Sequence, residues 1–196
     1  MNIFVAFIPW VLFSVVSQRD DVAVAGLVAL VAAIAIALPS FAKGRPKILD
    51  IGAIVSFAAF AAIGLAAGND AEWLTNFARG LATAALAAVA LLSLLFTPFT
   101  EQYARETTPP EIWESPIFKR VNRELTLMWG LVFAAMVPFH ILAGAIDTQR
   151  ANTFFNWVIP IGLIVWAVKR TEAVSAAAGD EADRKQAATP DTRSIA

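Results

Sequence analysis

The only histidine of this sequence, His140, lies in a long apolar segment and is the first candidate for chemistry. Three- and four-residue steps place it on one helical face with five other residues. The residues of this face are Asn122, Thr126, Trp129, Phe133, Met136 and His140. An ionisable group at membrane depth is a candidate for proton transfer or ligand binding. A hydrogen-bonded packing role is the simpler interpretation, and both stay open.

A second polar candidate, Asn156, follows Phe154 and Phe155 and precedes Trp157 in the last apolar segment. Aromatic residues gather at both membrane–water interfaces, so this group is interpreted first as an aromatic belt at the outer interface. The alternative is a polar ligand site that Asn156 would share with residues of the preceding segment. Those residues are Asn122, Trp129 and His140.

A cytoplasmic elbow is predicted over residues 98–124, before the fifth apolar segment. Thr108-Pro109-Pro110-Glu111 predicts a capping box that starts a short helix. Ser115-Pro116 predicts the cap of a second helix, which runs on into the membrane. Trp113, Arg120 and Arg123 would then lie at headgroup level, as in an interfacial segment. This pattern indicates either a structural anchor for the fifth helix or a docking surface for a partner.

The classes of chemistry that the sequence excludes are broad. It contains no cysteine, which removes disulfides, thiolate chemistry and cysteine-ligated metals. It contains none of the zinc-protease, nucleophile-elbow, phosphate-loop or dinucleotide patterns. Glu111 and Glu114 could pair as acid and base, but no neighbouring pattern predicts a pocket around them. We therefore expect no enzymatic activity, no catalytic residue, no metal and no cofactor.

The composition indicates a membrane protein. Hydrophobic residues make up 58% of the chain and charged residues 16%, against about 25% charged in a soluble domain. Residues 22–42 are apolar all round and contain no charge before position 43. A helix of this kind is either buried in a large core or surrounded by lipid, and a chain of 196 residues cannot bury several of them. The net charge of −1 gives no indication of nucleic-acid binding.

Six membrane spans are predicted, with five as the alternative, because a spanning helix needs about 20 apolar residues. They cover residues 2–17, 22–42, 50–67, 79–97, 125–146 and 153–169. The first is short and contains Pro9, and its loss would leave five spans. Asp50 is expected to cap the third span, where the helix dipole favours an acid. Gly64-x-x-x-Gly68 at the end of that span is a candidate for close helix packing.

The basic residues predict the orientation, because Lys and Arg collect in cytoplasmic loops. Six spans divide the 15 Lys and Arg residues into 12 on one side and three on the other. The rich side holds residues 42–49, the elbow and the C-terminal tail, and the three on the poor side are Arg19, Arg79 and Arg150. Both chain ends are therefore expected in the cytoplasm.

The domain organisation expected from this pattern has two parts. Residues 1–170 form an all-α membrane helix bundle, including the elbow. Residues 171–196 have almost no large apolar side chain and cannot bury enough surface to offset the entropy of ordering. We expect a disordered cytoplasmic tail there, after a short helical continuation of the last span.

The chain resembles the small inner-membrane proteins called intracellular septation protein A. The resemblance rests on three short motifs at the beginning and in the final third of the chain. They are Phe7-Ile8-Pro9 followed by Leu12-Phe13, Asn122 leading to Trp129-Gly130 and Phe133, and Phe155-Asn156-Trp157. The elbow is longer here than in that family, the Asn-to-Trp spacing is wider, and the family has five spans. The resemblance implies a role in envelope synthesis or septum formation and no catalytic residue.

The function expected is that of a non-enzymatic protein of the bacterial cytoplasmic (inner) membrane, acting in envelope synthesis or septation through protein partners. Trp113, Arg120 and Arg123 are the candidate docking residues. The expected partners are the lipid bilayer, membrane proteins of the envelope or division machinery and further copies of the chain. The alternative is a small transporter or lipid-handling protein centred on Asn122, Trp129, His140 and Asn156. A membrane enzyme acting on a lipid headgroup is the third hypothesis.

Overall fold

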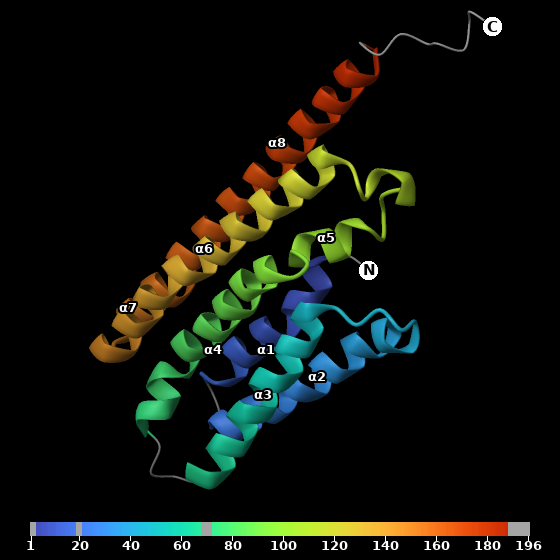
Figure 1. The fold of residues 1–196 in the computed structure, drawn as a ribbon. Coiled ribbons are helices and arrows are strands. Elements are labelled where there is room, and N and C mark those ends of the chain that lie inside the picture. The colour runs from blue at the N-terminus through green and yellow to red at the C-terminus, as the bar shows by residue number, and fades with distance from the viewer. Residues whose placement is uncertain (1–2, 19–20, 68–71, 188–196) are drawn as a thin grey trace, which may run out of the picture.

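The computed structural model describes residues 3–18, 21–67 and 72–187, and within these residues it contains helices and no strands (Figure 1). The long helices are α2 (Val22–Ala42), α3 (Ile48–Ala67), α4 (Glu72–Leu92), α6 (Pro116–Ile146) and α8 (Ile159–Ala187). The short α-helices are α1 (Ile8–Val16), α5 (Phe99–Ala104) and α7 (Gln149–Thr153). Tighter 3₁₀ turns form η1 (Ile3–Phe7), η3 (Ser93–Leu95) and η4 (Pro110–Ile112), and a π-helix forms η5 (Phe154–Val158).

Five helical segments are long and apolar enough to cross a membrane, so the chain is a multi-pass helical membrane protein. They are Val22–Ala42, Ile48–Ala67, Trp73–Leu95, Pro116–Ile146 and Gln149–Lys185. The predicted first span is shorter, with five residues in η1 and nine in α1. At helical rises of about 1.5–2 Å per residue it extends roughly 23 Å, less than the hydrocarbon core of about 30 Å.

The short N-terminal segment lies inside the bundle. Phe13 is fully buried and Trp10 is nearly so. The Trp10 ring lies 4.7 Å from that of Phe57 on α3, and the Phe13 ring lies 4.7 Å from that of Phe60. Offset aromatic pairs of this kind add to the stabilisation that burial gives. This segment is therefore part of the core between α2, α3 and α4, although it is shorter than a membrane span.

The helices pack in a simple order. α2 and α3 form an antiparallel pair, α1 packs against α2 and α4, and α4 also contacts α3 and α6. Figure 1 shows α6 and α8 side by side as an outer layer, with α8 extending past the first turn of α6. The elbow contains α5 and η4, so we call that end of the bundle the elbow end. The opposite end, where α4 begins and α6 ends, is the far end.

Two glycines set the distance between α2 and α3. A Cβ on Gly26 would lie 2.5 Å from the backbone nitrogen of Ala61, and a Cβ on Gly64 would lie 2.5 Å from that of Ala23. The two backbones thus touch at two points, as small residues allow in membranes. The contact predicted for Gly64 is confirmed, whereas Gly68 lies outside the described residues.

Several predicted boundaries shift. The fourth span begins at Glu72 instead of 79, because Trp73, Leu74 and Phe77 continue the helix ahead of Arg79. The prediction that Asp50 caps the third span is wrong: α3 begins at Ile48, which places Asp50 in its first turn. The amide of Ile48 donates instead to Gln102 Oε1, 2.8 Å away on α5.

The predicted disorder from residue 171 is corrected as far as Ala187, where α8 ends. Alanine, glutamate, arginine and lysine are strong helix formers and continue the last span beyond the bundle. Glu181 also joins two ion pairs, with Lys185 one turn later (2.8 Å) and with Arg120 on α6. Residues 188–196 lie outside the described residues, and the prediction for them stays a prediction.

Candidate functional site

The elbow end holds most of the buried polar side chains. Of the 11 buried polar or charged residues in the described chain, eight lie in the elbow or beside it. They are Ser40, Lys47, Asp50, Ser93, Thr100, Glu101, Asn122 and Thr126. Burying such groups without partners costs several kcal/mol in a membrane. The arrangement of their partners therefore decides how the elbow is held.

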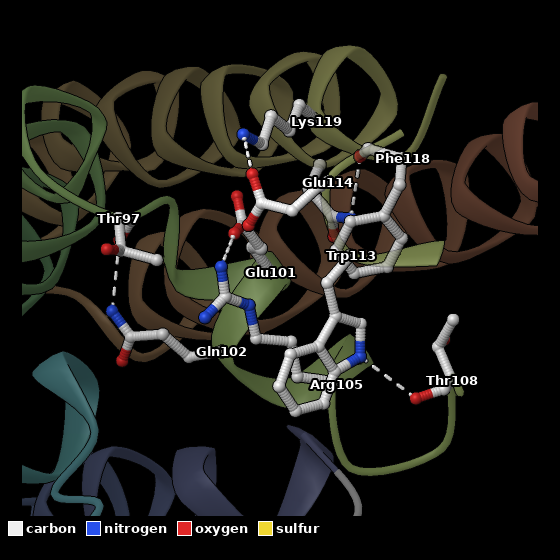
Figure 2. Close-up of polar contacts among 10 residues, drawn as sticks. Thr97, Glu101, Gln102, Arg105, Thr108, Trp113, Glu114, Phe118 and Lys119 are labelled. Atoms are coloured by element: carbon white, nitrogen blue, oxygen red, sulfur yellow. Dashed lines mark hydrogen bonds and ion pairs between the residues drawn. The ribbon is translucent and has the colours of Figure 1, made fainter. Parts of the chain in front are cut away.

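One chain of contacts lies within the elbow and holds its parts together (Figure 2). Glu101 is buried and pairs at 2.5 Å with Arg105, which lies one turn later and caps the end of α5. The guanidinium carbon of Arg105 lies 5.1 Å from the centre of the Trp113 ring. The Trp113 indole nitrogen donates to the carbonyl oxygen of Thr108 at 2.9 Å. A carboxylate, a guanidinium and an indole thus join α5 to the turn η4.

A second group of contacts fixes the elbow to α3, which is bonded in turn to α2. The buried Asp50 carboxylate accepts from Ser40 Oγ at 2.8 Å and from the Tyr103 hydroxyl at 3.3 Å. Lys47 Nζ lies 4.1 Å above the Tyr103 ring and 2.8 Å from a Glu106 carboxylate oxygen. Tyr103 therefore lies between an acid and a base that precede α5 by about 50 residues in sequence.

A third group fixes the elbow to α6. The Thr100 hydroxyl donates to the backbone oxygen of Asn122 at 2.7 Å and lies 2.8 Å from Thr126 Oγ1. Asn122 donates from Nδ2 to the Phe118 oxygen at 2.9 Å. The predicted cap of α6 is confirmed, because Ser115 Oγ accepts from the Phe118 amide at 3.2 Å. The elbow is thus bonded to α3 and α6.

The predicted capping box at Thr108 is wrong. The helical turn η4 begins at Pro110, so Pro109 occupies the cap position, with ψ at 143°. A residue that precedes proline is driven to extended backbone, and this applies to Pro109 before Pro110. Thr108 therefore lies one residue too early to cap the turn, and its carbonyl oxygen binds Trp113 instead.

Each predicted docking residue has a partner within the chain. Trp113 is half-buried against Arg105, and Arg120 pairs with Glu181 on α8. Arg123 donates to the backbone oxygen of Leu94 at 3.4 Å and is exposed. These side chains therefore shape the elbow, while Arg120 and Arg123 also remain on its surface.

The predicted inward face of α6 is confirmed, since every one of its six residues is buried. Its polar members separate into different contacts. Trp129 Nε1 donates to Thr171 Oγ1 on α8 at 3.1 Å, and its ring stacks 6.0 Å from that of Phe7. His140 lies near the far end, with Nδ1 2.7 Å from Asn156 Oδ1. The structure thus brings His140 and Asn156 together and places Asn122 with the elbow.

Sequence reasoning missed the part that five polar or charged residues play in holding the elbow: Lys47, Asp50, Glu101, Tyr103 and Arg105. The four-residue step from Glu101 to Arg105 does predict a helical ion pair. Their burial could not be predicted, because it depends on α2 and α3 meeting α5 in space. Arg79 at the far end was also missed, although a charge beside an apolar run is a functional signal in a membrane.

An alkaline titration tests the contact between Asp50 and Tyr103. Burial, followed by the negative charge of Asp50, raises the pKa of Tyr103 far above its usual value of 10. The raised pKa means that the protonated Tyr103 hydroxyl stabilises the folded protein fully below pH 10. This stabilisation is lost as the pH rises further, because Tyr103 releases its proton at a lower pH in the unfolded protein than in the folded one. Tyr103 is the only tyrosine, so phenolate absorbance reports it alone.

We expect native protein to show no phenolate signal near pH 10 and to gain it only together with loss of helical circular dichroism. Asp50→Asn removes the charge and should lower the pH at which the signal appears. An ordinary, reversible phenolate titration in protein that stays helical would contradict the buried contact.

The fold and the polar clusters define a class, a multi-pass helical membrane protein with a folded elbow at one end. Among the described residues, no group of three His, Asp or Glu side chains is placed to hold a metal ion. No family model, curated protein or solved structure matches the chain. The resemblance to intracellular septation protein A therefore stays a prediction.

Proposed function

We propose that this chain is a non-enzymatic protein of the bacterial cytoplasmic membrane that acts in envelope synthesis or septation by binding protein partners through its elbow. One observation carries the binding role: buried contacts join the elbow to α3, to Lys47 just before α3, and to α6. A surface held in one shape binds without the entropic cost of ordering its side chains. A loop that only linked two spans would need none of these buried charges.

The surface offered to a partner combines apolar and charged groups. Ile112 at the tip of the elbow is 46% exposed. Beside it, Lys119 pairs with Glu114, and both side chains are more than half exposed. Arg120 is 58% exposed although it pairs with Glu181. Protein interfaces usually combine apolar groups with a polar rim, and this segment exposes both kinds of group.

The extension of α8 enlarges this surface. The ion pair between Arg120 and Glu181 holds the last turns of α8 beside the first turns of α6 (Figure 1). A membrane span needs about 20 residues, so a helix that runs from Ile159 to Ala187 projects beyond the bilayer. The elbow and this extension are therefore proposed to form one cytoplasmic docking face. The process, envelope synthesis or septation, rests on the family resemblance alone.

Affinity capture tests the docking face. Native protein and the Arg120→Glu/Arg123→Glu variant are solubilised in mild detergent, and co-purified proteins are identified by mass spectrometry. Charge reversal at a rim of this kind should reduce capture of a specific partner by about tenfold. Arg150→Glu, an exposed charge reversal at the far end, is the control and should capture as the native chain does.

A charge swap separates docking from the internal ion pair. Arg120→Glu with Glu181→Arg can restore the pair to α8 while reversing the charge at both positions. We expect this variant to be more stable than Arg120→Glu alone, although it exchanges the Glu181–Lys185 pair for two like charges one turn apart, and still to capture less partner. Equal capture by all variants, or lipid alone in every preparation, would contradict the proposal.

A further inference from the structure

Arg79 is a buried cation that has no counterion among the described residues. It lies near the start of α4 at the far end, and 6% of its surface is exposed. None of the ion pairs found among the described residues includes it, and its Nε is buried without a hydrogen-bond partner. A buried charge is costly unless it is paired and hydrogen-bonded. Within the part of the chain that the structure describes, this charge is therefore hydrogen-bonded but not neutralised.

Neutral groups from α1, α7 and η5 surround the guanidinium. Arg79 Nη2 donates to the backbone oxygen of Ser14 at 2.5 Å, and Nη1 lies 3.5 Å from Asn152 Oδ1. With its amide oxygen turned inward, Gln18 accepts from both Nη atoms and, at 3.0 Å, from Trp157 Nε1. The guanidinium carbon lies 5.6 Å from the centre of the Trp157 ring. These contacts orient the cation without neutralising it.

The cradle continues into α6. Asn156 Nδ2 donates to Asn152 Oδ1 at 2.7 Å, and Asn156 Oδ1 lies 2.7 Å from His140 Nδ1. Asn156 and Trp157 both lie in the π-helical segment η5, a geometry found frequently at functional sites. The site thus gathers the two far-end candidates from the sequence, His140 and Asn156, around an arginine.

The rim of the site faces both water and lipid. Gln18 is exposed at the end of α1. Phe154 and Val158, at the two ends of η5, are 51% and 53% exposed. In a membrane, exposed apolar side chains near the end of a span are expected to contact lipid close to the headgroups. A ligand with an anionic head and apolar tails would therefore satisfy both parts of the surface.

We propose that the far end is a binding site for a phosphate group, with Arg79 as the counterion and Gln18, Asn152 and Trp157 as its polar rim. The guanidinium fork matches the geometry of phosphate oxygens and is less strongly hydrated than an ammonium. No carboxylate of the described residues contacts Arg79, which leaves its charge for the ligand. The source of the phosphate is a phospholipid headgroup or soluble phosphate.

Binding is measured on delipidated full-length protein in detergent, by native mass spectrometry and by the shift in thermal unfolding. The probes are dioleoylphosphatidylglycerol, dioleoylglycerol as the lipid without phosphate, and inorganic phosphate against chloride at equal ionic strength. Stabilisation by phosphatidylglycerol alone supports the site and assigns it to a lipid headgroup. Stabilisation by inorganic phosphate as well supports the site and assigns it to the phosphate group itself.

Variants at the site make the test specific. Arg79→Gln should weaken binding by roughly ten- to a hundredfold, as expected on losing a charged hydrogen bond. Arg150→Gln, at the same end on α7 and exposed, should bind as the native chain does.

Gln18→Glu keeps the test valid even where Arg79→Gln fails to fold. A carboxylate at this position would pair with Arg79 from within the chain. The lipid-free protein should then become more stable while phosphate binding falls. Unchanged binding in Gln18→Glu would overturn the proposal. Equal stabilisation by dioleoylglycerol, or no response to either phosphate probe, would also overturn it.

Discussion

Gly26→Ala and Gly64→Ala should each destabilise the bundle by about 3 kcal/mol, at the upper end for overpacked cores. The added methyl groups would lie 2.5 Å from backbone nitrogens of the facing helix, at Ala61 and Ala23 respectively. No side-chain rotation can relieve a clash with backbone, so α2 and α3 must move apart. The double variant should lose less stability than the two single variants together, because helices that separate at one glycine also separate at the other.

The measurement is thermal unfolding in detergent, followed by helical circular dichroism and by the monodisperse fraction in size-exclusion chromatography. Gly162→Ala is the matched control, because no atom lies within 4 Å of a Cβ at this position on α8. Unfolding of both variants at the temperature of the control would show that α2 and α3 do not touch at these glycines.

Glu101→Leu should destabilise the protein by about 2–3 kcal/mol, below the range for a fully buried ion pair. The Glu101 side chain is 7% exposed and that of its partner Arg105 is 35% exposed. Water can therefore solvate part of the Arg105 charge once the carboxylate is removed, which reduces the loss of stability. Removal of the carboxylate leaves a guanidinium whose Nε is buried without a hydrogen-bond partner. Stacking against Trp113 cannot replace an opposite charge.

A double-mutant cycle isolates this pair. Arg105→Leu alone leaves the buried Glu101 carboxylate without its cation, and Glu101→Leu/Arg105→Leu removes both charges. We expect the double variant to be more stable than either single one, because a buried ion pair replaced by apolar residues is often neutral. Glu101→Gln keeps the shape of the side chain, and its stability should lie between that of the native protein and that of Glu101→Leu. Strictly additive losses would show that the two side chains do not interact.

The apolar helices were predictable because their signal is local. Each long span contains a continuous apolar run, and the inward face of α6 follows from helical spacing alone. Ser115 was predictable as a cap for the same reason, since cap and helix are adjacent in sequence. The choice between six and five spans depended on η1 and α1. This segment is short for a membrane span, and its apolar residues are buried in the core of the bundle.

The charged contacts of the elbow could not be predicted, because they join distant segments. Asp50 has the sequence of a helix cap, yet its partners are Ser40 on α2 and Tyr103 on α5. Nothing local distinguishes a solvated aspartate from one that a folded loop covers. Arg79 is a similar case, because its significance depends on which acids lie near it in space.

The helical extension of α8 shows a limit of composition-based reasoning. Residues 171–187 have few large apolar side chains, which correctly indicates that they form no core. Their helix persists because strong helix formers follow a helix that has already nucleated, and because Glu181 is paired twice. Composition excluded burial here but did not exclude secondary structure.

Site-specific photo-crosslinking in living cells tests the central claim, that the elbow is a docking surface for a protein. The crosslinking amino acid replaces Ile112 at the tip of the elbow or, as control, Ile161 on the exposed apolar face of α8. The account predicts that position 112 forms a discrete adduct with an envelope or division protein, that position 161 does not, and that Glu101→Leu weakens the adduct. If position 112 crosslinks only to lipid, as position 161 is expected to do, the elbow is a structural anchor and the docking proposal is wrong.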